Sequence, residues 1–232
     1  MEIKVLASGS AGNAYTISDG STTLLIECGL PWNELKVKLN FALPDACLIS
    51  HSHGDHANCL DRMLGFGIPC YASKETFDEC KVISHLRNNI EHGKLFSVGS
   101  FDIQPLEMAH DVKCMGFYIY SRRTGDTLFF ATDTYYIPYK LPSLDYIMVE
   151  ANYDTDILNR NILSGHIDPA MKSRLVRSHM EINNTASWLL NQDLTKTRRI
   201  YLLHLSDGNS NAEEFKAKVI EATGVPVTIA GG

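Results

Sequence analysis

Four side chains that can bind a metal ion lie close together in the run HSHGDH at 51–56. The run follows ACLIS (46–50), a short apolar segment that predicts a buried strand. Side chains two positions apart in extended backbone point to the same side, so His51 and His53 can bind one cation together. Asp55 and His56 lie on the expected turn into a helix, where they can bind a second cation. Imidazole nitrogens and carboxylate oxygens are natural zinc ligands, so this run predicts a metal site.

Three more candidate ligands lie at the ends of apolar segments: His110 in LEMAHDV, Asp133 in FFATDT and His204 in IYLLHLS. A carboxylate at the end of a buried strand needs a partner that offsets the cost of desolvation. A metal ion is one such partner. A buried arginine or a helix cap is the ordinary alternative for Asp133, and partial exposure is the alternative for His110. Three such positions in addition to HSHGDH favour the metal.

HSHGDH resembles the HxHxDH signature of the metallo-β-lactamase-fold hydrolases. The resemblance implies an α/β (α+β) fold, a four-layer αβ/βα sandwich of two mixed β-sheets with a metal site at the sheet edges. It also implies two divalent metal ions, zinc first and manganese as the alternative. The implied ligands are His51, His53 and His110 for one ion, Asp55, His56 and His204 for the other, and Asp133 as the bridge.

Within this superfamily the chain resembles WalJ/YycJ-type proteins, a phosphodiesterase-like branch related to ribonuclease Z. The resemblance rests on VLASGSAGNAYTI, EANYD at 150–154, SHMEINNTASWLL and LLHLSDGNSN, so it runs from residue 4 to about residue 215. Glu27 stands where Asp is more usual, and SHMEINN matches the branch pattern only loosely. A β-lactamase would usually lack Asp133, and a glyoxalase II-type enzyme would add a helical region after His204. A phosphodiesterase acting on nucleic acid or on a small cyclic phosphodiester is therefore expected.

Outside the metal ligands, His179 and Glu150 are the candidate proton donor and the carboxylate that orients it. A surface histidine at the end of a basic helix is the alternative for His179. Lys172, Arg174 and Arg177 precede it and could guide a polyanion. DTYYIPY (133–139) could stack on bases or line an acyl pocket, so a thioesterase or lactonase stays open, as does a metal-binding module without catalysis.

Composition limits the class of protein. The 232 residues are 44% hydrophobic and carry a net charge of −6, which is typical of a folded domain and excludes disorder. Residues 160–199 hold seven basic and three acidic residues, so this segment carries a charge of +4 and the rest of the chain carries −10. The six cysteines occur singly and are expected to be reduced in a cytoplasmic protein. We find no secretory signal and no membrane span, expect one domain (1–232), and leave protein partners and oligomeric state open.

Periodicity and turn residues predict the elements that position these groups. Strands are expected at 3–7, 14–28, 46–50, 68–72, 94–99, 101–110, 116–123, 126–134, 145–150, 198–206 and 225–230. Helices are expected at 32–42, ended by Pro44, then at 55–64 with Asp55 as the cap, at 74–88, through the basic region to about 192, and at 211–224. His85, His92 and His166 lie at no strand end, so we expect them to be unrelated to metal.

Overall fold

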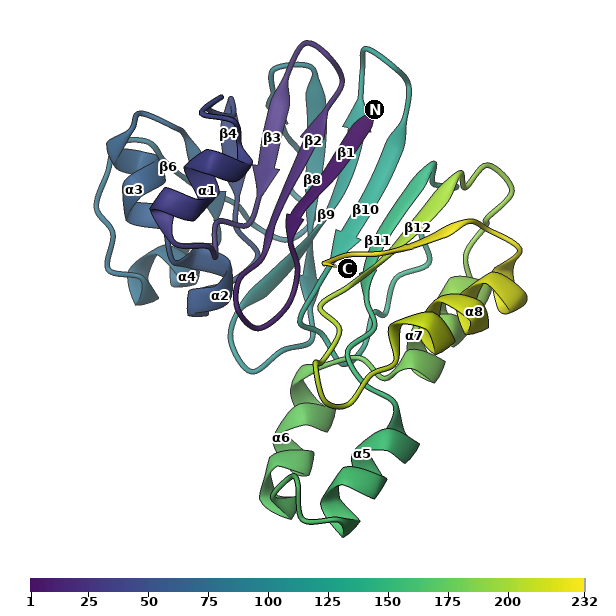
Figure 1. Cartoon of the computed structure of the whole chain (residues 1–232). Helices are drawn as coiled ribbons and strands as arrows, with labels where there is room; N and C mark the ends of the chain where they lie inside the picture. Colours follow the sequence, from purple (N-terminus) through teal and green to yellow (C-terminus); the bar gives the residue numbers. More distant parts are fainter. Residues whose placement is uncertain (232) are drawn as a thin grey trace. The chain divides into compact units, whose positions relative to one another are not determined.

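A computed structural model describes residues 1–231, with Met171 described by its backbone alone. The chain forms two compact units (Figure 1). Unit 1 comprises residues 1–107 and 112–126 with Gly231, and unit 2 comprises residues 108–111 and 127–230. Each is described by itself below, and the expectation of a single domain stays a prediction.

Unit 1 begins with a sheet whose strands follow one another in chain order. They are β1 (Glu2–Ala7), β2 (Ala14–Ser18), β3 (Thr23–Ile26), β4 (Ala46–Leu48), β5 (Cys70–Ala72) and β6 (Arg87–Asn89). The first three pair antiparallel, and β3 to β6 pair parallel, so the sheet is mixed. The expected strand at 14–28 is two strands, because the turn Asp19–Thr22 reverses the chain within it.

The helices of unit 1 are shorter than expected: α1 (Trp32–Lys38), α2 (Gly54–Ala57), α3 (Leu60–Gly65) and α4 (Lys74–Glu79). The 32–42 helix ends before Pro44, because Asn40 and Phe41 take left-handed backbone with φ of 51° and 59°. Lys81 does the same with φ of 54°, and part of the expected 74–88 helix is strand β6. The 55–64 helix is divided into α2 and α3, with His53 rather than Asp55 at the α2 cap.

Unit 1 also holds β7 (Phe96–Val98), β8 (Phe101–Met108, whose last residue is assigned to unit 2) and β9 (Cys114–Ser121). β7 and β8 form an antiparallel hairpin. All six cysteines are free thiols. Burial raises the pKa of Cys59 to about 12 and that of Cys80 to about 11, so these thiols are uncharged at neutral pH.

Unit 2 contains four parallel strands in the order β10 (Thr127–Ala131), β11 (Tyr146–Glu150), β12 (Arg199–Leu203) and β13 (Val227–Ile229). Parallel strands share the edge at which their carboxyl ends lie. Its helices are α5 (Thr155–Leu163), α6 (Pro169–Ser178), α7 (Ile182–Leu190) and α8 (Ala212–Thr223). Within unit 2, α5 and α6 form a helical hairpin that extends beyond the strands (Figure 1). Because β10, β11 and β12 are parallel neighbours, the residues that follow them lie at the same edge of the sheet.

The strands form two mixed sheets, so the expected mixed α and β class is confirmed. Among residues 1–231, none of the helices combines the length and the hydropathy that a membrane crossing requires.

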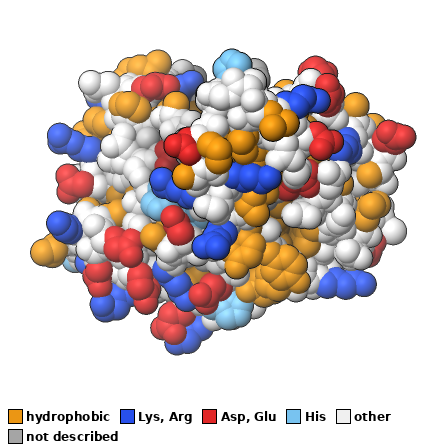
Figure 2. Space-filling view, turned by 90° about the horizontal axis from the view of Figure 1, so that it is seen from below, with side chains coloured by type: hydrophobic (Ala, Val, Ile, Leu, Met, Phe, Trp, Pro, Cys, Tyr) orange, Lys and Arg blue, Asp and Glu red, His pale blue; other side chains and the backbone are white. Residues whose placement is uncertain are grey.

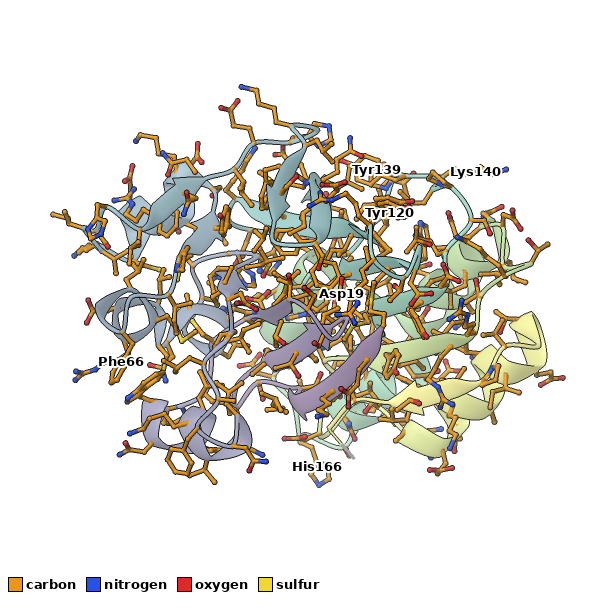
Figure 3. The ribbon with its side chains drawn as sticks, turned by 90° about the horizontal axis from the view of Figure 1, so that it is seen from above. Asp19, Phe66, Tyr120, Tyr139, Lys140 and His166 are labelled. Atoms are coloured by element: carbon orange, nitrogen blue, oxygen red, sulfur yellow. The ribbon has the colours of Figure 1, made fainter. Side chains whose placement is uncertain are left out.

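One buried carboxylate, Asp19, organises the end of unit 1 where its strands turn; it is labelled in Figure 3. Its Oδ1 accepts the backbone N–H groups of Ser21 at 3.0 Å and Thr22 at 3.1 Å. Its Oδ2 accepts the hydroxyls of Ser100 at 2.6 Å and Ser121 at 2.7 Å. Burial opposes ionisation, but these four hydrogen bonds outweigh it and lower the pKa of Asp19 well below its usual value.

Asp19→Asn should therefore lower the free energy of unfolding by about 2–4 kcal/mol at pH 7, because the new amide NH₂ cannot accept the two hydroxyls. A lowered carboxyl pKa stabilises the fold above the unfolded value of about 3.9, and this contribution is lost as pH falls below it. The difference between wild type and variant should therefore begin to shrink at about pH 4 and continue to shrink down to about pH 2. Urea unfolding at several pH values measures the loss of unfolding free energy and its dependence on pH. Asp207→Asn, which changes an exposed carboxylate, is the control. If the difference in unfolding free energy between wild type and Asp19→Asn did not change with pH, Asp19 would not stabilise the fold as an ionised carboxylate.

Candidate metal centre

The HSHGDH run, which begins three positions after the last residue of β4, brings its three histidine rings close together in unit 1. The His51 ring centroid lies 4.6 Å from that of His53 and 4.2 Å from that of His56. Asp55 Oδ2 lies 3.3 Å from His56 Nε2. His53 caps the short helix α2, so the chain turns within the motif. Unit 1 therefore gathers all four of its predicted ligands.

Two segments remote in sequence hold this motif by backbone hydrogen bonds. Asn13 N–H donates to Asp55 O at 2.8 Å, and Cys28 N–H donates to His56 O at 2.8 Å. The Asn13 amide also donates to Asp55 O at 3.2 Å and lies 3.1 Å from His56 Nε2. Gly29 N–H donates to Asn13 O at 3.0 Å, which joins the two segments to each other.

Beneath these rings lies Glu27, fully buried at the end of β3 with a left-handed φ of 62°. Its carboxylate accepts Ser50 N–H at 3.2 and 3.3 Å and lies 3.6 Å from His56 Nδ1. Ser50 Oγ shares a hydrogen bond of 2.8 Å with His51 Nδ1. Burial raises the pKa of Glu27, and the nearby His56 offsets this only in part. Glu27, which stands where Asp is more usual, thus lies beside His56 and is linked to His51 through Ser50.

Unit 2 gathers a second set of donors at the carboxyl ends of its parallel strands. Asp133, Glu150, His179 and His204 each offer a donor atom within 4.8 Å of those of the others. His204 Nδ1 lies 3.8 Å from Asp133 Oδ1 and 3.4 Å from Glu150 Oε1. The rings of His179 and His204 are stacked, with centroids 5.3 Å apart.

The expected hydrogen bond between His179 and Glu150 is present, with Nδ1 donating to Oε1 at 2.6 Å. Burial lowers the pKa of His179, but the charges of Glu150 and Asp133 outweigh it, so the pKa is raised. Burial likewise opposes ionisation of Glu150, and His179 outweighs it, so that pKa is lowered. The pair therefore favours imidazolium beside carboxylate.

His110 belongs to unit 2 and lies two positions after the last residue of β8. Its predicted place at the end of a strand is therefore confirmed. Its Nδ1 bonds to the carbonyl of Ser178 at 3.1 Å, and its Nε2 lies 3.1 Å from Asp111 Oδ1. Its ring centroid is 6.1 Å from that of His179. Fixing one ring nitrogen on a carbonyl is how a ligating histidine is commonly oriented.

Asp133 and His204 both take left-handed backbone, with φ of 48° and 53°. Such backbone costs about 1–3 kcal/mol in a residue other than glycine and persists where the surroundings enforce it. Asn152 is one such support, because its amide donates to His204 O at 2.7 Å and lies 3.1 Å from His204 Nδ1. Asn152 falls in the EANYD run, but its contact was not predicted. Asn13 and Gly29 are also contacts that the sequence does not predict; Asn13 ends the turn-forming SGSAGN, whereas Gly29 lies outside it and carries no signal.

The other histidines do not join these groups among the residues that the structure describes. His92 Nδ1 accepts the Glu107 N–H at 3.1 Å, and His85 is exposed between α4 and β6. His166 bonds Ser164 Oγ at 2.6 Å and projects outward (Figure 3). Lys172, Arg174 and Arg177 all lie on α6, the helix that ends at His179.

The donor chemistry of each set suits a divalent cation. Each combines imidazole nitrogens with carboxylate oxygens, the ligands that zinc and manganese share.

Residues 22–205 match the family described as the beta-lactamase superfamily domain. The chain belongs to the beta-lactamase superfamily. The family predicted from HSHGDH is thereby confirmed. Among solved structures, the chain is similar to the metallo-beta-lactamase fold protein YhfI from Bacillus subtilis, with a TM-score of 0.77 at 18% identity. That similarity covers 99% of this chain and 97% of YhfI, and it confirms the predicted fold.

Within the superfamily the chain is similar to two proteins named exodeoxyribonucleases. It is 28% identical over 228 residues to WalJ from Streptococcus pneumoniae, covering 90% of this chain and 83% of that protein. It is 26% identical over 239 residues to YycJ from Bacillus anthracis, covering 94% of this chain and 88% of that protein. The predicted resemblance to WalJ/YycJ-type proteins is confirmed.

Gly29→Ala should destabilise unit 1, because a Cβ built on Gly29 lies 1.6 Å from the Asp55 carbonyl oxygen. We expect the free energy of unfolding, measured in urea without added metal, to fall by at least about 2 kcal/mol. Gly65→Ala is the matched control, since its Cβ meets no atom within 4 Å and Gly65 is helical. That variant should be unchanged or stabilised by up to about 1 kcal/mol. Equal stability of Gly29→Ala and wild type would contradict the close approach.

Proposed function

We propose that this chain is a divalent-metal-dependent phosphodiester hydrolase, a nuclease that acts on DNA. The observation that carries the proposal is the gathering of imidazole and carboxylate donors in HSHGDH and at the strand ends of unit 2. The identity to proteins named exodeoxyribonucleases, over most of the length of both chains, supports DNA as the polymer. The free cysteines fit a cytoplasmic location, which is part of the proposal.

The proposed ligands are those that the family resemblance implies. One cation would be held by His51, His53 and His110, the other by Asp55, His56 and His204, with Asp133 shared. Zinc is the proposed metal and manganese the alternative. The chemistry supplied by two bound divalent cations is activation of a water and neutralisation of phosphate charge. Glu27, Ser50, Asn13 and Asn152 would keep these side chains in place through the contacts above.

His179 is the proposed proton donor to the leaving oxygen. Its Nδ1 is committed to Glu150, so Nε2 is the atom that would deliver the proton. Glu150 holds the ring in this orientation and favours its protonated form. Asp55, besides its role as a ligand, would accept a hydrogen bond from the attacking water.

Lys172, Arg174 and Arg177 are proposed to attract the DNA backbone toward His179. Arg174 and Arg177 are exposed on α6, and Lys172 Nζ donates to Asn159 Oδ1 at 2.6 Å. Figure 2 shows basic side chains interspersed with acidic and apolar ones rather than a continuous basic face. A local guiding role suits this pattern better than coating of long DNA.

The proposal predicts hydrolysis of single- or double-stranded oligodeoxynucleotides and of bis-p-nitrophenyl phosphate after loading with zinc or manganese. Elemental analysis should give about two metal ions per chain in wild type. Asp133→Ala should lose metal from both sites and lose hydrolysis, since its carboxylate is shared. Cleavage of an acyl thioester but of no phosphodiester would overturn the proposal. Loss of one metal only in Asp133→Ala would overturn the bridging role.

His179→Ala should lower kcat on DNA by about 10²–10⁴-fold while both metals stay bound, as expected for loss of a general acid. The loss should be much smaller on bis-p-nitrophenyl phosphate, because p-nitrophenolate leaves without needing a proton. Metal content is measured beside the rates, because His179 lies among the possible ligands. Equal losses on both substrates, or loss of metal, would assign His179 a ligand or structural role instead.

A further inference from the structure

Unit 2 contains a cavity of about 380 Å³ between α7 and the loop that follows β10. This volume lies in the lower part of the range of roughly 300–1,000 Å³ found for small-ligand sites. The loop contributes Tyr135, Tyr136, Tyr139 and Lys140; Figure 3 labels the last two side by side.

Two exposed tyrosines and one face of a helix make up the walls. Tyr135 is 46% exposed and Tyr136 is 59% exposed, although both line the cavity. From α7 and its C-cap come Asn184, Ser187, Trp188 and Asn191, which are spaced i, i+3, i+4 and i+7 and so share one helix face. The cavity therefore combines flat aromatic surfaces with amide and hydroxyl groups.

Hydrogen bonds within unit 2 hold the loop in place. Thr134 Oγ1 accepts the Ala109 N–H at 3.1 Å and donates to Tyr136 O at 2.8 Å. Tyr135 N–H donates to Ala109 O at 3.1 Å, so both tyrosines have a fixed backbone. Across the cavity, Trp188 Nε1 donates to Tyr139 O at 3.1 Å. A loop whose backbone is held in this way loses little backbone entropy when a ligand binds to it.

Glu150 connects this cavity to the proposed catalytic residues. Its Oε2 accepts Thr134 N–H at 3.0 Å and Met180 N–H at 3.1 Å. Thr134 directly follows Asp133, and Met180, which lines the cavity, directly follows His179. The cavity wall thus begins within two residues of both Asp133 and His179.

We propose that this cavity binds a nucleobase of the DNA strand, beside the phosphodiester that is cleaved; this rests on the proposed function. Every base has a face that can stack on an aromatic side chain, and Asn184 offers an amide for its edge. Lys140 at the cavity supplies a positive charge for a neighbouring phosphate. An acyl chain, which the tyrosines alone would also suit, makes no use of the amide or the charge.

The test compares two esters with the same leaving group, thymidine p-nitrophenyl phosphate (the 5′ and the 3′ ester) and methyl p-nitrophenyl phosphate. Metal-loaded wild type should prefer at least one nucleoside ester in kcat/KM by about 5- to 100-fold, the range for stacking of one base. Tyr136→Ala should remove most of this preference, and Tyr136→Phe should keep it. Tyr120→Ala, which replaces a 38% exposed tyrosine on β9 of unit 1, is the matched control and should keep it.

A binding measurement separates this proposal from the proposed function. Thymidine monophosphate should quench the Trp188 fluorescence of a Trp32→Phe variant, more weakly after Tyr136→Ala. If neither ester is hydrolysed but thymidine monophosphate still quenches the Trp188 fluorescence, the proposed nuclease function is wrong and the proposed base site is supported. Hydrolysis of both esters at equal efficiency, or a preference unaffected by Tyr136→Ala, would overturn the base site and leave the hydrolase standing.

Discussion

The buried carboxylate of Glu150 is the group on which the arrangement of unit 2 depends. It has no exposed surface, so its charge must be met by protein donors. Those donors come from two segments distant in the chain: the N–H of Thr134, and the ring of His179 with the N–H of Met180. Removing the carboxylate would leave the loop after β10 and the junction of α6 and α7 without their common partner. One side chain therefore contacts both the proposed proton donor and the wall of the cavity beside α7.

In unit 1, backbone hydrogen bonds hold the HSHGDH run in place in addition to the contacts of the buried Glu27 carboxylate. The HSHGDH loop follows a three-residue strand and leads into a four-residue helix, neither of which could hold it alone. Asn13 and Cys28 supply the missing hydrogen bonds, and the absence of a side chain at Gly29 lets the chain approach Asp55. The first hairpin of the chain thus serves the motif that follows it by about forty residues.

Helix lengths show where sequence patterns were insufficient. The runs 32–42 and 74–88 have helical spacing of apolar residues, but the helices end at Lys38 and Glu79. Left-handed backbone at Asn40, Phe41 and Lys81 ends them, ahead of the end that Pro44 marks for the first and without a proline or glycine in the second. Asp133 and His204 share this backbone, and their sequence gives no sign of it either. Such conformations are enforced by packing around the residue, so a local pattern cannot reveal them.

By itself the sequence determined the donor types, their places at strand ends, the superfamily and the pairing of His179 with Glu150. Short-range periodicity and sequence motifs indicate these features, and both can be recognised without knowing how the chain packs. Only the tertiary structure decided that Asn13 and Asn152 support His56 and His204, that Gly29 must lack a side chain, and that a tyrosine loop faces α7 across a cavity. These are contacts between residues far apart in the chain. Their partners are chosen by how the sheets and helices pack, and no spacing along the sequence encodes that choice.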